Sequence, residues 1–498
     1  MNNIMFLARL LVLFSLVCIS CAHSSFEQKQ LKHALNFATS NRLELEILLQ
    51  HYTYDSLKLE AAKFLIRNMP HCYSYQQGGE MDSVKRVRTY YSPFGQIDQT
   101  YARRWGHYTY RNLPKIYDAH IITAEYLIDN IDRAFDNWQK RPWNRSLSFE
   151  DFCEYLLPYR IGDEPLEEWR ELYEKKYGYL LDSIYKGSDV VEAANLVSRH
   201  LQEPVFIYCE DFELPHIGPR YLFSHRYGSC VDAADIVTYA FRAVGIPCME
   251  DTDARGGHVW NVVRDTTGRD VPIWYIASEA VRGSRDTGGY KRGKVYRPMY
   301  GFQEEKAAHL GDDWKSMPLL FYHPYMKDVS YAYYPDTLRI LTGIPDDEVC
   351  YLAHFHEAHW WSCACARSAS GKMEIPNLES ELVYLPMKYT KGNYYPSGFP
   401  FWFAGGEINT FLPDWEKTVK VRLYRKYPVY GWLRSFMGHV VGGTFEGSMT
   451  KNFEDGKTLY EIADTPVIAR NRIFLNKSVK CRYIRYKACL LYTSDAAD

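Results

Sequence analysis

The spacing of apolar and polar residues changes along the chain, and the change divides it into regions of different structure. Between residues 26 and 70, apolar side chains recur every three or four positions, as in "LELEILLQHY" and "LKLEAAKFLIRNMP", which predicts helices that stop at Pro70. The segment "SLSFEDFCEYLLPYR" predicts a further helix with Ser148 at its N-cap, Asp151 completing a capping box and Pro158 ending it. We therefore expect residues 22–190 to form an α-helical N-terminal region.

Helical and strand patterns mix in the next part of the chain. A helix is expected from Ser229 to Val244, and two short strands, "HVWNVV" and "VPIWYI", follow it on either side of the turn "RDTTGRD". The expected buried stripe of that helix consists of Val231, Ala234, Val237, Phe241 and Val244. This combination indicates a compact α+β core over residues 191–325.

From residue 326 onward the pattern is that of short strands separated by Gly, Pro, Asn and Asp. "TLRILTG", "ELVYLPM", "GEINTFLP" and "VKVRLYRKYP" predict a β-sandwich over residues 326–428. "GGTFEGSMTKNFEDGKTLYEI" and "CRYIRYKA" predict a second β-sandwich over residues 429–488. The expected fold class is multidomain α+β.

Composition and charge narrow the class of protein. A chain of 498 residues is expected to hold two to four domains, and with 46% hydrophobic and 24% charged residues it can bury a core. The formal net charge of −2 gives no excess of positive charge, which a nucleic-acid-binding protein would be expected to have. Aromatic residues reach 16%, which core packing explains, although aromatic-rich exported proteins also bind sugars by stacking.

The two ends of the sequence are expected to lie outside the folded domains. Residues 1–21 have the early Arg9 and the short apolar run of a signal peptide, and they end in "CISC", which resembles a bacterial lipobox. We expect Cys21 to be lipidated, so that the protein is exported, is periplasmic or held at the bacterial outer membrane, and meets the membrane only through its lipid anchor. Plain cleavage of the signal peptide is the alternative, because Cys18 stands where a lipobox usually has leucine. Residues 489–498 resemble translated sequencing-adapter sequence, so the last sandwich is expected to be truncated.

The start of the helix at Ser229 is the strongest candidate for chemistry. Ser229 and Asp232 have capping-box spacing, which places Cys230 in the first turn, where the positive end of the helix dipole favours thiolate over thiol. A thiolate that attacks an amide also needs a group to protonate the leaving amine. His258, which begins the next expected strand in "GGHVWNVV", is the best candidate for that group.

These two segments have a family resemblance. Together, "GSCVDAADIVTYAFRAVGIP" and "GGHVWNVV" resemble the transglutaminase-like core, in which a cysteine begins a helix and a histidine lies on the following strand. Flanking segments such as "LSFEDFCEYLLPYRIGDEPLEEWR" resemble those of bacterial multidomain transglutaminase-like lipoproteins, and the last region resembles galactose-binding-like sandwiches. The resemblance implies a papain-like core with a Cys–His–Asp triad, Cys230 as nucleophile and His258 as proton shuttle.

The third member of the triad is where the sequence departs from the family. The family pattern has an aspartate four residues after a tryptophan on the strand that follows the histidine. Here Trp274 is followed at that distance by Ser278, with Glu279 next, and we expect Glu279 to orient the histidine by a carboxylate hydrogen bond. Asp265 and Asp270 are the alternatives, but they lie in the predicted turn and are expected to form it.

Three other features offer chemistry that we do not expect to be used. "HFHEAHWWSCAC" brings together the possible metal ligands His354, His356, Glu357, His359, Cys363 and Cys365. Its histidine spacing is one residue short of the zinc-protease motif and its surroundings indicate strands, on which His354 and His356 would share a face. His225, close before the candidate nucleophile, is expected to be structural, with substrate binding as the alternative. "SGFPFWFAGGE" is expected to pack in a core, with a carbohydrate-stacking platform as the alternative.

The expected activity follows from the cysteine and the histidine. We expect a protease or amidase, or an acyltransferase, that acts on an amide of a peptide or glycopeptide through a thioester. No cofactor or metal is required by this chemistry, and few or no disulfides are expected, because the cysteine spacing shows no framework. The alternative is a catalytically inactive surface lipoprotein that binds glycans or peptides through its sandwich domains.

Overall fold

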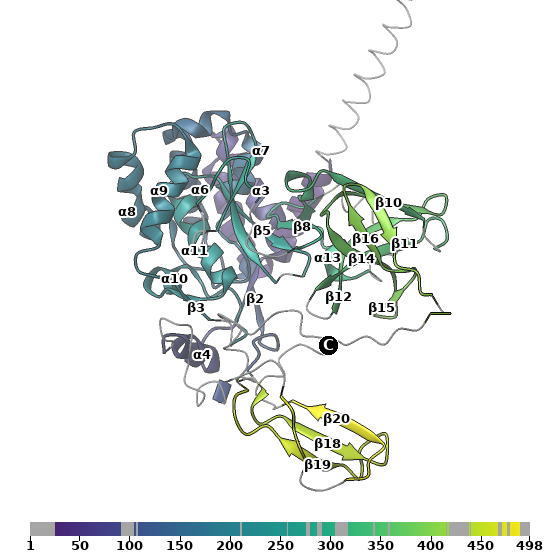
Figure 1. The fold of residues 1–498 in the computed structure, drawn as a ribbon. Coiled ribbons are helices and arrows are strands. Elements are labelled where there is room, and N and C mark those ends of the chain that lie inside the picture. The colour runs from purple at the N-terminus through teal and green to yellow at the C-terminus, as the bar shows by residue number, and fades with distance from the viewer. Residues whose placement is uncertain are drawn as a thin grey trace, which may run out of the picture. The chain divides into compact units, whose positions relative to one another are not determined.

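The computed structural model describes residues 25–90, 104–105, 108–209, 212–255, 257–274, 279–285, 291–303, 317–341, 344–356, 359–414, 416–417, 438, 440–466, 471–475 and 479–488. The chain forms two compact units, one of residues 1–89, 110–210 and 214–412, and one of residues 90–109, 211–213 and 413–498. Helices and several antiparallel sheets make up the fold (Figure 1), which confirms the mixed α and β composition. The signal segment with Cys21, the strand expected at 419–428 and the adapter-like residues 489–498 lie outside the described residues.

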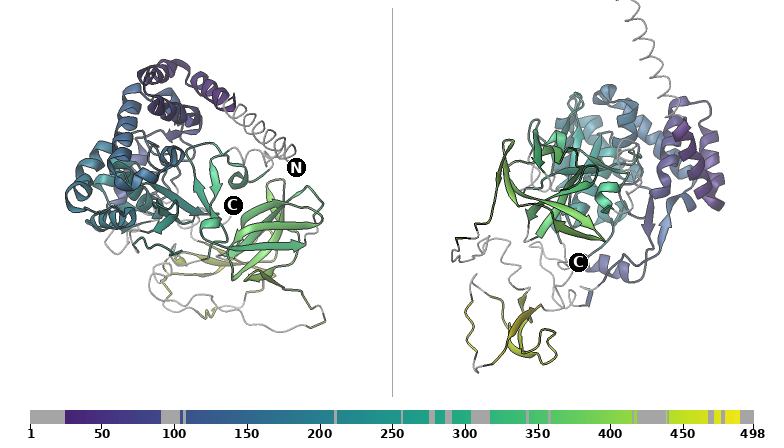
Figure 2. Two further views of the ribbon diagram at one scale, coloured as in Figure 1. Left: turned by 90° about the horizontal axis from the view of Figure 1, so that it is seen from above. Right: turned by 90° about the vertical axis from the view of Figure 1, so that its right-hand side faces the viewer.

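Helices make up most of the N-terminal part of the first unit, as the apolar spacing predicted, and Figure 2 shows them apart from the strands of residues 336–410. After a helix over residues 25–37 come α2 (Arg42–His51), α3 (Ser56–Asn68), α4 (Glu80–Arg88), α6 (Ala124–Lys140), α7 (Phe149–Tyr155), α8 (Arg170–Tyr179) and α9 (Val190–Leu201). The short strands β1 (Tyr73–Tyr75) and β2 (Lys115–Tyr117) pair between them. Apolar side chains of α2, α3, α6 and α7 share one core.

The capping residue predicted for α7 is confirmed, but the helix ends early. Ser148 accepts a hydrogen bond from the amide of Asp151 at 3.1 Å. The helix ends at Tyr155 rather than at Pro158, and the amides of Leu156 and Leu157 both donate to the Phe152 carbonyl, at 3.1 and 3.0 Å. The Arg170 guanidinium binds the carbonyls of residues 156, 157 and 158 at 2.6, 3.0 and 3.2 Å, which gives partners to carbonyls that lack one within the helix.

Two further helices lead into the core. The parallel pair β3 (Ile207–Tyr208) and β4 (Tyr227–Gly228) flanks α10 (Pro219–Ser224) and brings the chain to α11 (Cys230–Ala243). The sequence predicted one buried stripe on α11, which is wrong: every residue from Asp232 to Ala243 is buried, whereas Val231 is only half-buried. The reason is that α8, α9 and α10 pack around α11 while strands cover its remaining side.

An antiparallel sheet of five strands, in the order β7-β6-β5-β8-β9, supports α11. Its strands are β5 (Cys248–Asp253), β6 (Val259–Arg264), β7 (Asp270–Ile273), β8 (Val295–Pro298) and β9 (Met326–Asp328). The β6–β7 hairpin was predicted, whereas β5, β8 and β9 were not. Val263 and Ile273 face α11 in one core, while Trp260 and Val262 belong to a second core on the other face.

Two antiparallel sheets follow in the same unit and share one core. The smaller pairs β10 (Asp336–Leu341) with β13 (Lys372–Leu378). The larger consists of β11 (Val349–His356), β12 (His359–Arg367), β14 (Leu382–Thr390), β15 (Asn393–Pro396), β16 (Phe401–Ala404) and β17 (Glu407–Thr410). The short helix α13 (Leu319–Tyr322) contributes Phe321 to a further apolar cluster with side chains of the larger sheet.

The second unit contains one sheet among its described residues. Its antiparallel strands lie in the order β19-β18-β20. They are β18 (Thr444–Ser448), β19 (Lys457–Glu461) and β20 (Tyr483–Lys487), which confirms the strands predicted in this region.

Candidate active site

The predicted nucleophile begins the buried helix α11. Ser229, at the N-cap, accepts a hydrogen bond from the amide of Val231 at 3.3 Å, and the Asp232 carboxylate accepts one from the amide of Ser229 at 2.8 Å. The predicted capping box is therefore confirmed. Cys230 occupies the first helical position and is 5% exposed. A thiol at this position meets the positive end of the helix dipole, which stabilises its thiolate form.

Helix α11 and strand β6 run in the same direction. The Asn261 amide group donates to the carbonyl of Ala234 at 3.0 Å, near the start of the helix. Near its end, the Arg242 guanidinium donates to the carbonyl of Cys248 at 3.2 Å, and Cys248 is the register partner of Val263. The first turn of α11 therefore lies at the same end of the pair as the beginning of β6.

This alignment brings the backbone positions of the two predicted catalytic residues to one end of the core. Cys230 precedes Ala234 by one helical turn, about 6 Å. His258 precedes Asn261 by three residues, about 10 Å of extended chain. Cys230 and His258, which are 28 positions apart in the sequence, thus lie at the same end of the packed pair of α11 and β6.

His258 lies directly before β6 and is 5% exposed. Its carbonyl accepts hydrogen bonds from the Thr252 hydroxyl at 3.1 Å and from the amide of Asp253 at 3.3 Å, which fixes its backbone to β5. Its ring lies 5.7 Å from that of Trp260, nearly parallel, and 4.8 Å from that of Trp274, edge to face. The predicted shared face of His258 and Trp260 is consistent with this arrangement.

The loop that leads into His258 is held by two side chains that the sequence did not single out. The Asp253 carboxylate accepts hydrogen bonds from the amides of Arg255 at 3.0 Å and Gly257 at 2.8 Å. The Arg255 guanidinium lies 5.5 Å from the ring centre of Trp361 on β12. The neighbouring sheet region thus contacts the loop that carries the histidine.

The predicted third member of the triad lies at the surface. The Glu279 carboxylate forms an ion pair of 2.6 Å with Arg199 on α9, and its side chain is 49% exposed. The alternative Asp265 is a turn former, as predicted, because it accepts hydrogen bonds from the amides of Thr267 at 2.8 Å and Arg269 at 3.1 Å. The orientation of His258 by Glu279 stays a prediction.

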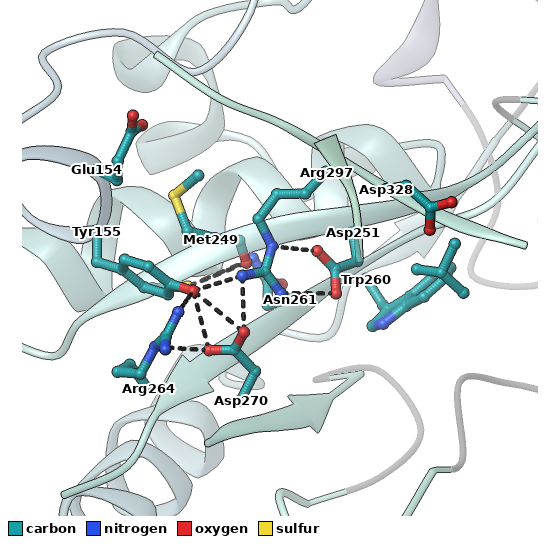
Figure 3. Close-up of polar contacts among 12 residues, drawn as sticks. Glu154, Tyr155, Met249, Asp251, Trp260, Asn261, Arg264, Asp270, Arg297 and Asp328 are labelled. Carbon is teal, nitrogen blue, oxygen red and sulfur yellow. Dashed lines mark hydrogen bonds and ion pairs between the residues drawn. The ribbon is translucent and has the colours of Figure 1, made fainter. Parts of the chain in front are cut away.

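The other alternative, Asp270, was predicted to form the turn, and this is wrong. Asp270 begins β7 and is part of a buried network of charged side chains (Figure 3). Its carboxylate binds Arg297 at 2.7 Å, Arg264 at 3.0 Å and the Tyr155 hydroxyl at 3.0 Å. The prediction for Asp270 failed for a physical reason. The residues around an aspartate beside a turn are the same whether its side chain faces solvent or an arginine that is distant in the sequence.

The same network reaches the tryptophan beside His258. Arg297 forms a second ion pair, of 2.6 Å, with Asp251, and burial raises the pKa of Asp251 despite that pair (Figure 3). Asp251 also accepts a hydrogen bond from the Tyr333 hydroxyl at 2.6 Å, and Tyr333 accepts one from the indole of Trp260 at 2.9 Å. Trp260, whose ring lies against that of His258, is thus fixed through Tyr333 to a buried charge.

A second histidine, which the sequence analysis missed, lies beside the middle of α11. His216 Nδ1 is 2.9 Å from the buried carboxylate of Asp235. Burial raises the pKa of Asp235 to about 6, and the Asp235 carboxylate raises the pKa of His216 despite the opposing effect of burial. Glu250 on β5 accepts a hydrogen bond from the Thr238 hydroxyl at 2.7 Å, and burial, with Asp235 nearby, raises its pKa to about 8. No local motif marks these residues, because they meet only through the packing of α11.

The remaining candidates have structural surroundings. His225 ends α10, where its ring stacks on Tyr221 at 4.5 Å. His354 and His356 lie on β11 with rings 6.2 Å apart, and burial lowers the pKa of His354 to about 4. Glu357 lies outside the described residues, and within the described part of the chain no three His, Cys, Asp or Glu side chains are grouped to hold a metal.

The aromatic side chains near residue 400 alternate between buried and exposed along β16. Phe401 and Phe403 are fully buried in the core of the two sheets, as predicted, whereas Trp402 between them is 36% exposed and Phe399 is 50% exposed. The cysteines of the described residues are thiols and not disulfides.

Comparison with protein-family models, with curated proteins and with solved structures finds no match. Within the described residues, the helices lack the length or the apolar character that crossing a bilayer requires.

Proposed function

We propose that this protein is an exported cysteine hydrolase of transglutaminase-like type that cleaves an amide bond of a peptide or glycopeptide. The observation that carries the proposal is the shared end of α11 and β6, where Cys230 begins a capped helix and His258 begins the strand beside it. The helix N-terminus favours the thiolate, and a histidine at the same end would supply the proton that the leaving amine needs. We interpret the sheets of residues 336–410 as the predicted β-sandwich and residues 444–487 as part of the galactose-binding-like one.

The proposed reaction has two halves. His258 takes the proton of the Cys230 thiol, the sulfur attacks the carbonyl carbon, and the carbon–nitrogen bond breaks as His258 returns the proton to the leaving amine. Water, deprotonated by His258, then attacks the thioester and releases the carboxylic acid and the thiol. An amine in place of water would give a cross-link, and we propose hydrolysis as the main outcome. Neither half requires a cofactor.

Two features of the site set conditions on this chemistry. Cys230 and His258 are each 5% exposed, so substrate reaches them only when the segments that cover them move. Glu279 would orient His258 only after leaving its ion pair with Arg199. We further propose that lipidation of Cys21 holds the enzyme at the bacterial outer membrane or in the periplasm, where peptides and glycopeptides are its partners.

Alkylation of the folded protein with iodoacetamide near neutral pH tests the proposal. We expect Cys230 to be modified, and its modification to slow in His258→Ala. Cys248 is the internal control, because it is fully buried and burial raises its pKa to about 12. A Cys230 that stays unmodified until the protein unfolds would overturn the proposal.

A second experiment identifies the substrate. Wild type and Cys230→Ala are incubated with a library of peptides and glycopeptides, and the products are compared by mass spectrometry.

A second candidate function is a catalytically inactive surface lipoprotein that binds glycans or peptides. It is favoured by exposed aromatic side chains in the two-sheet region, where Phe355 is 42%, Trp402 36% and Tyr395 47% exposed. Aromatic faces of this kind bind sugars by stacking. Glycan binding that is lost in Trp402→Ala and kept in Cys230→Ala, together with an inert Cys230, would favour this function over the hydrolase.

A further inference from the structure

The carboxylate of Asp232 lies in the first turn of α11. One of its oxygens accepts hydrogen bonds from the Ser229 amide at 2.8 Å and the Ser229 hydroxyl at 3.2 Å, so it lies against the residue that precedes Cys230. Its side chain is 4% exposed. A Cβ on Gly228 would lie 2.3 Å from the same carboxylate oxygen, so the backbone closes over the carboxylate.

A distant arginine compensates this buried charge. Arg88, the last residue of α4, donates from Nη1 to the same Asp232 oxygen at 2.9 Å, and its side chain is also 4% exposed. The two residues are 144 positions apart, so the ion pair joins the N-terminal helical region to the first turn of α11. A buried ion pair loses its compensation when one partner is removed, and the remaining charge then acts on its neighbours with little screening.

The position of this pair has a consequence for the cysteine. An uncompensated carboxylate beside the first turn would oppose a second negative charge there and would offset the stabilisation that the helix dipole gives a thiolate. The geometry points to Arg88 as a positioning residue: we propose that it neutralises Asp232 and holds the capping box, so that Cys230 can ionise. This inference rests on the proposed function, because it concerns the readiness of the same nucleophile.

Other titratable groups surround the ion pair of Arg88 and Asp232. Lys85 lies on α4 itself, Asp235 on α11 and Tyr221 on α10, and each interacts electrostatically with Arg88 or Asp232. Cys209, whose amide donates to the carbonyl of Gly228 at 2.8 Å, also interacts with Arg88. His258 lies at the adjacent start of β6. The Asp232 carboxylate itself accepts hydrogen bonds from Ser229 and Arg88.

The test is the pH profile of Cys230 alkylation by iodoacetamide in the full chain. In Arg88→Met we expect the thiol to titrate about one pH unit higher, so that alkylation at pH 7 is about tenfold slower than in wild type. The double variant Arg88→Met with Asp232→Asn removes both charges and keeps an oxygen acceptor for the Ser229 amide. We expect its rate to return to within about twofold of wild type, and Arg88→Lys to lie between wild type and Arg88→Met.

A matched control exists at the other end of the same helix. Arg141 is also buried, with 4% side-chain exposure, and its Nε donates at 2.8 Å to the carbonyl of Val244, at the end of α11. Arg141→Met should lower stability without moving the alkylation profile. If Arg88→Met fails to fold, the profile of Arg88→Lys decides between the two outcomes.

The outcomes separate the inference from the proposed function. A wild-type Cys230 that resists alkylation while folded overturns the proposed function. A wild-type Cys230 that reacts, with a profile unchanged in Arg88→Met or a rate not restored in the double variant, overturns only the role of Arg88. A profile shifted equally by Arg141→Met would show a general effect of stability and would also overturn that role.

Discussion

The two ends of α11 are both held firmly, but by different means. At its C-terminal end, neutral and cationic donors bind the last carbonyls: the side chain of Asn137 binds that of Ala243 at 3.1 Å, Arg141 binds that of Val244 at 2.8 Å, and Trp143 binds that of Gly245 at 2.9 Å. At its N-terminal end, the Asp232 carboxylate accepts hydrogen bonds from the Ser229 amide and from the buried Arg88, and the Ser229 hydroxyl accepts one from the Val231 amide.

Under the proposed function, the C-terminal end of α11 has only a structural role, whereas the N-terminal end also serves the reaction. The last carbonyls of a helix lack partners within it, so donors at the C-terminal end satisfy them and complement the negative end of the dipole. The N-terminal end could have been capped by Ser229 alone, as many helices are. Instead it contains a buried carboxylate next to a cysteine, an arrangement that is costly unless Arg88 stays in place.

Asp232→Ala should cause the largest loss. It removes the acceptor for the Ser229 amide and leaves the Arg88 guanidinium buried without its carboxylate, so we expect a loss of about 3–5 kcal/mol in the free energy of unfolding. Urea unfolding measures it. The control is Asp189→Ala: Asp189 also caps a helix, α9, and also pairs with an arginine, Arg282, but that pair is exposed, so about 1 kcal/mol is expected. Equal losses would show that burial of the pair contributes nothing.

Glu250→Gln should have a smaller effect, of opposite sign and dependent on pH. Glu250 contacts the middle of α11 through Thr238, and burial raises its pKa to about 8 from 4.5. The folded protein therefore binds the Glu250 proton more tightly than the unfolded chain, so the contribution of this group to stability is present below pH 4.5 and is lost as pH rises through about 8. We expect the variant to match wild type at pH 5 and to exceed it by about 2–4 kcal/mol at pH 9. Unfolding curves at both pH values measure the difference, and a difference that does not change with pH would contradict it.

Gly245→Ala tests the C-terminal end and should cost about 1–3 kcal/mol in the free energy of unfolding. Gly245 has a φ of +81°, and a Cβ there would lie 2.8 Å from Arg141 Cγ and 2.9 Å from the carbonyl oxygen of Asn137. Gly268 offers a matched control, because its φ is +77° and nothing lies within 4 Å of its Cβ position. Gly268→Ala measures the backbone strain alone, so the excess in Gly245→Ala reports how tightly the end of α11 is packed. The proposal of tight packing fails if the two losses are equal.

The sequence predicted the parts of this site that depend on local chemistry. The Ser229–Asp232 capping box, the helix end near Gly245 and the β6–β7 hairpin each follow from residues within a few positions of one another. The partners of these elements could not be predicted. Arg88 reaches Asp232 from 144 positions away, and a short helix rich in charged residues gives no sign of which arginine will be buried.

The same limit explains the errors. Asp270 was expected to be a turn former because its neighbours in the sequence form a turn, whereas its partners Arg297 and Tyr155 come from other elements. The burial of α11 on all sides was missed because a helix surrounded by other helices and strands need not have one apolar stripe. Glu279 was chosen by its position relative to a family pattern and stays a prediction; its ion pair with Arg199 on α9 could not be predicted from that position.

Ser229→Ala should have the smallest effect and should complete the comparison of the two ends. The Ser229 hydroxyl accepts a hydrogen bond from the Val231 amide at 3.3 Å and donates one to the Asp232 carboxylate at 3.2 Å, whereas the bond from the Ser229 amide to that carboxylate remains after the substitution. We expect a loss of about 1 kcal/mol in the free energy of unfolding, and only a few tenths in Ser229→Gly, because glycine is tolerated at the N-cap. Urea unfolding of both variants beside Asp232→Ala ranks the contributions. If Ser229→Ala cost as much as Asp232→Ala, the hydroxyl rather than the buried ion pair would hold the start of α11, and the contrast between its two ends would disappear.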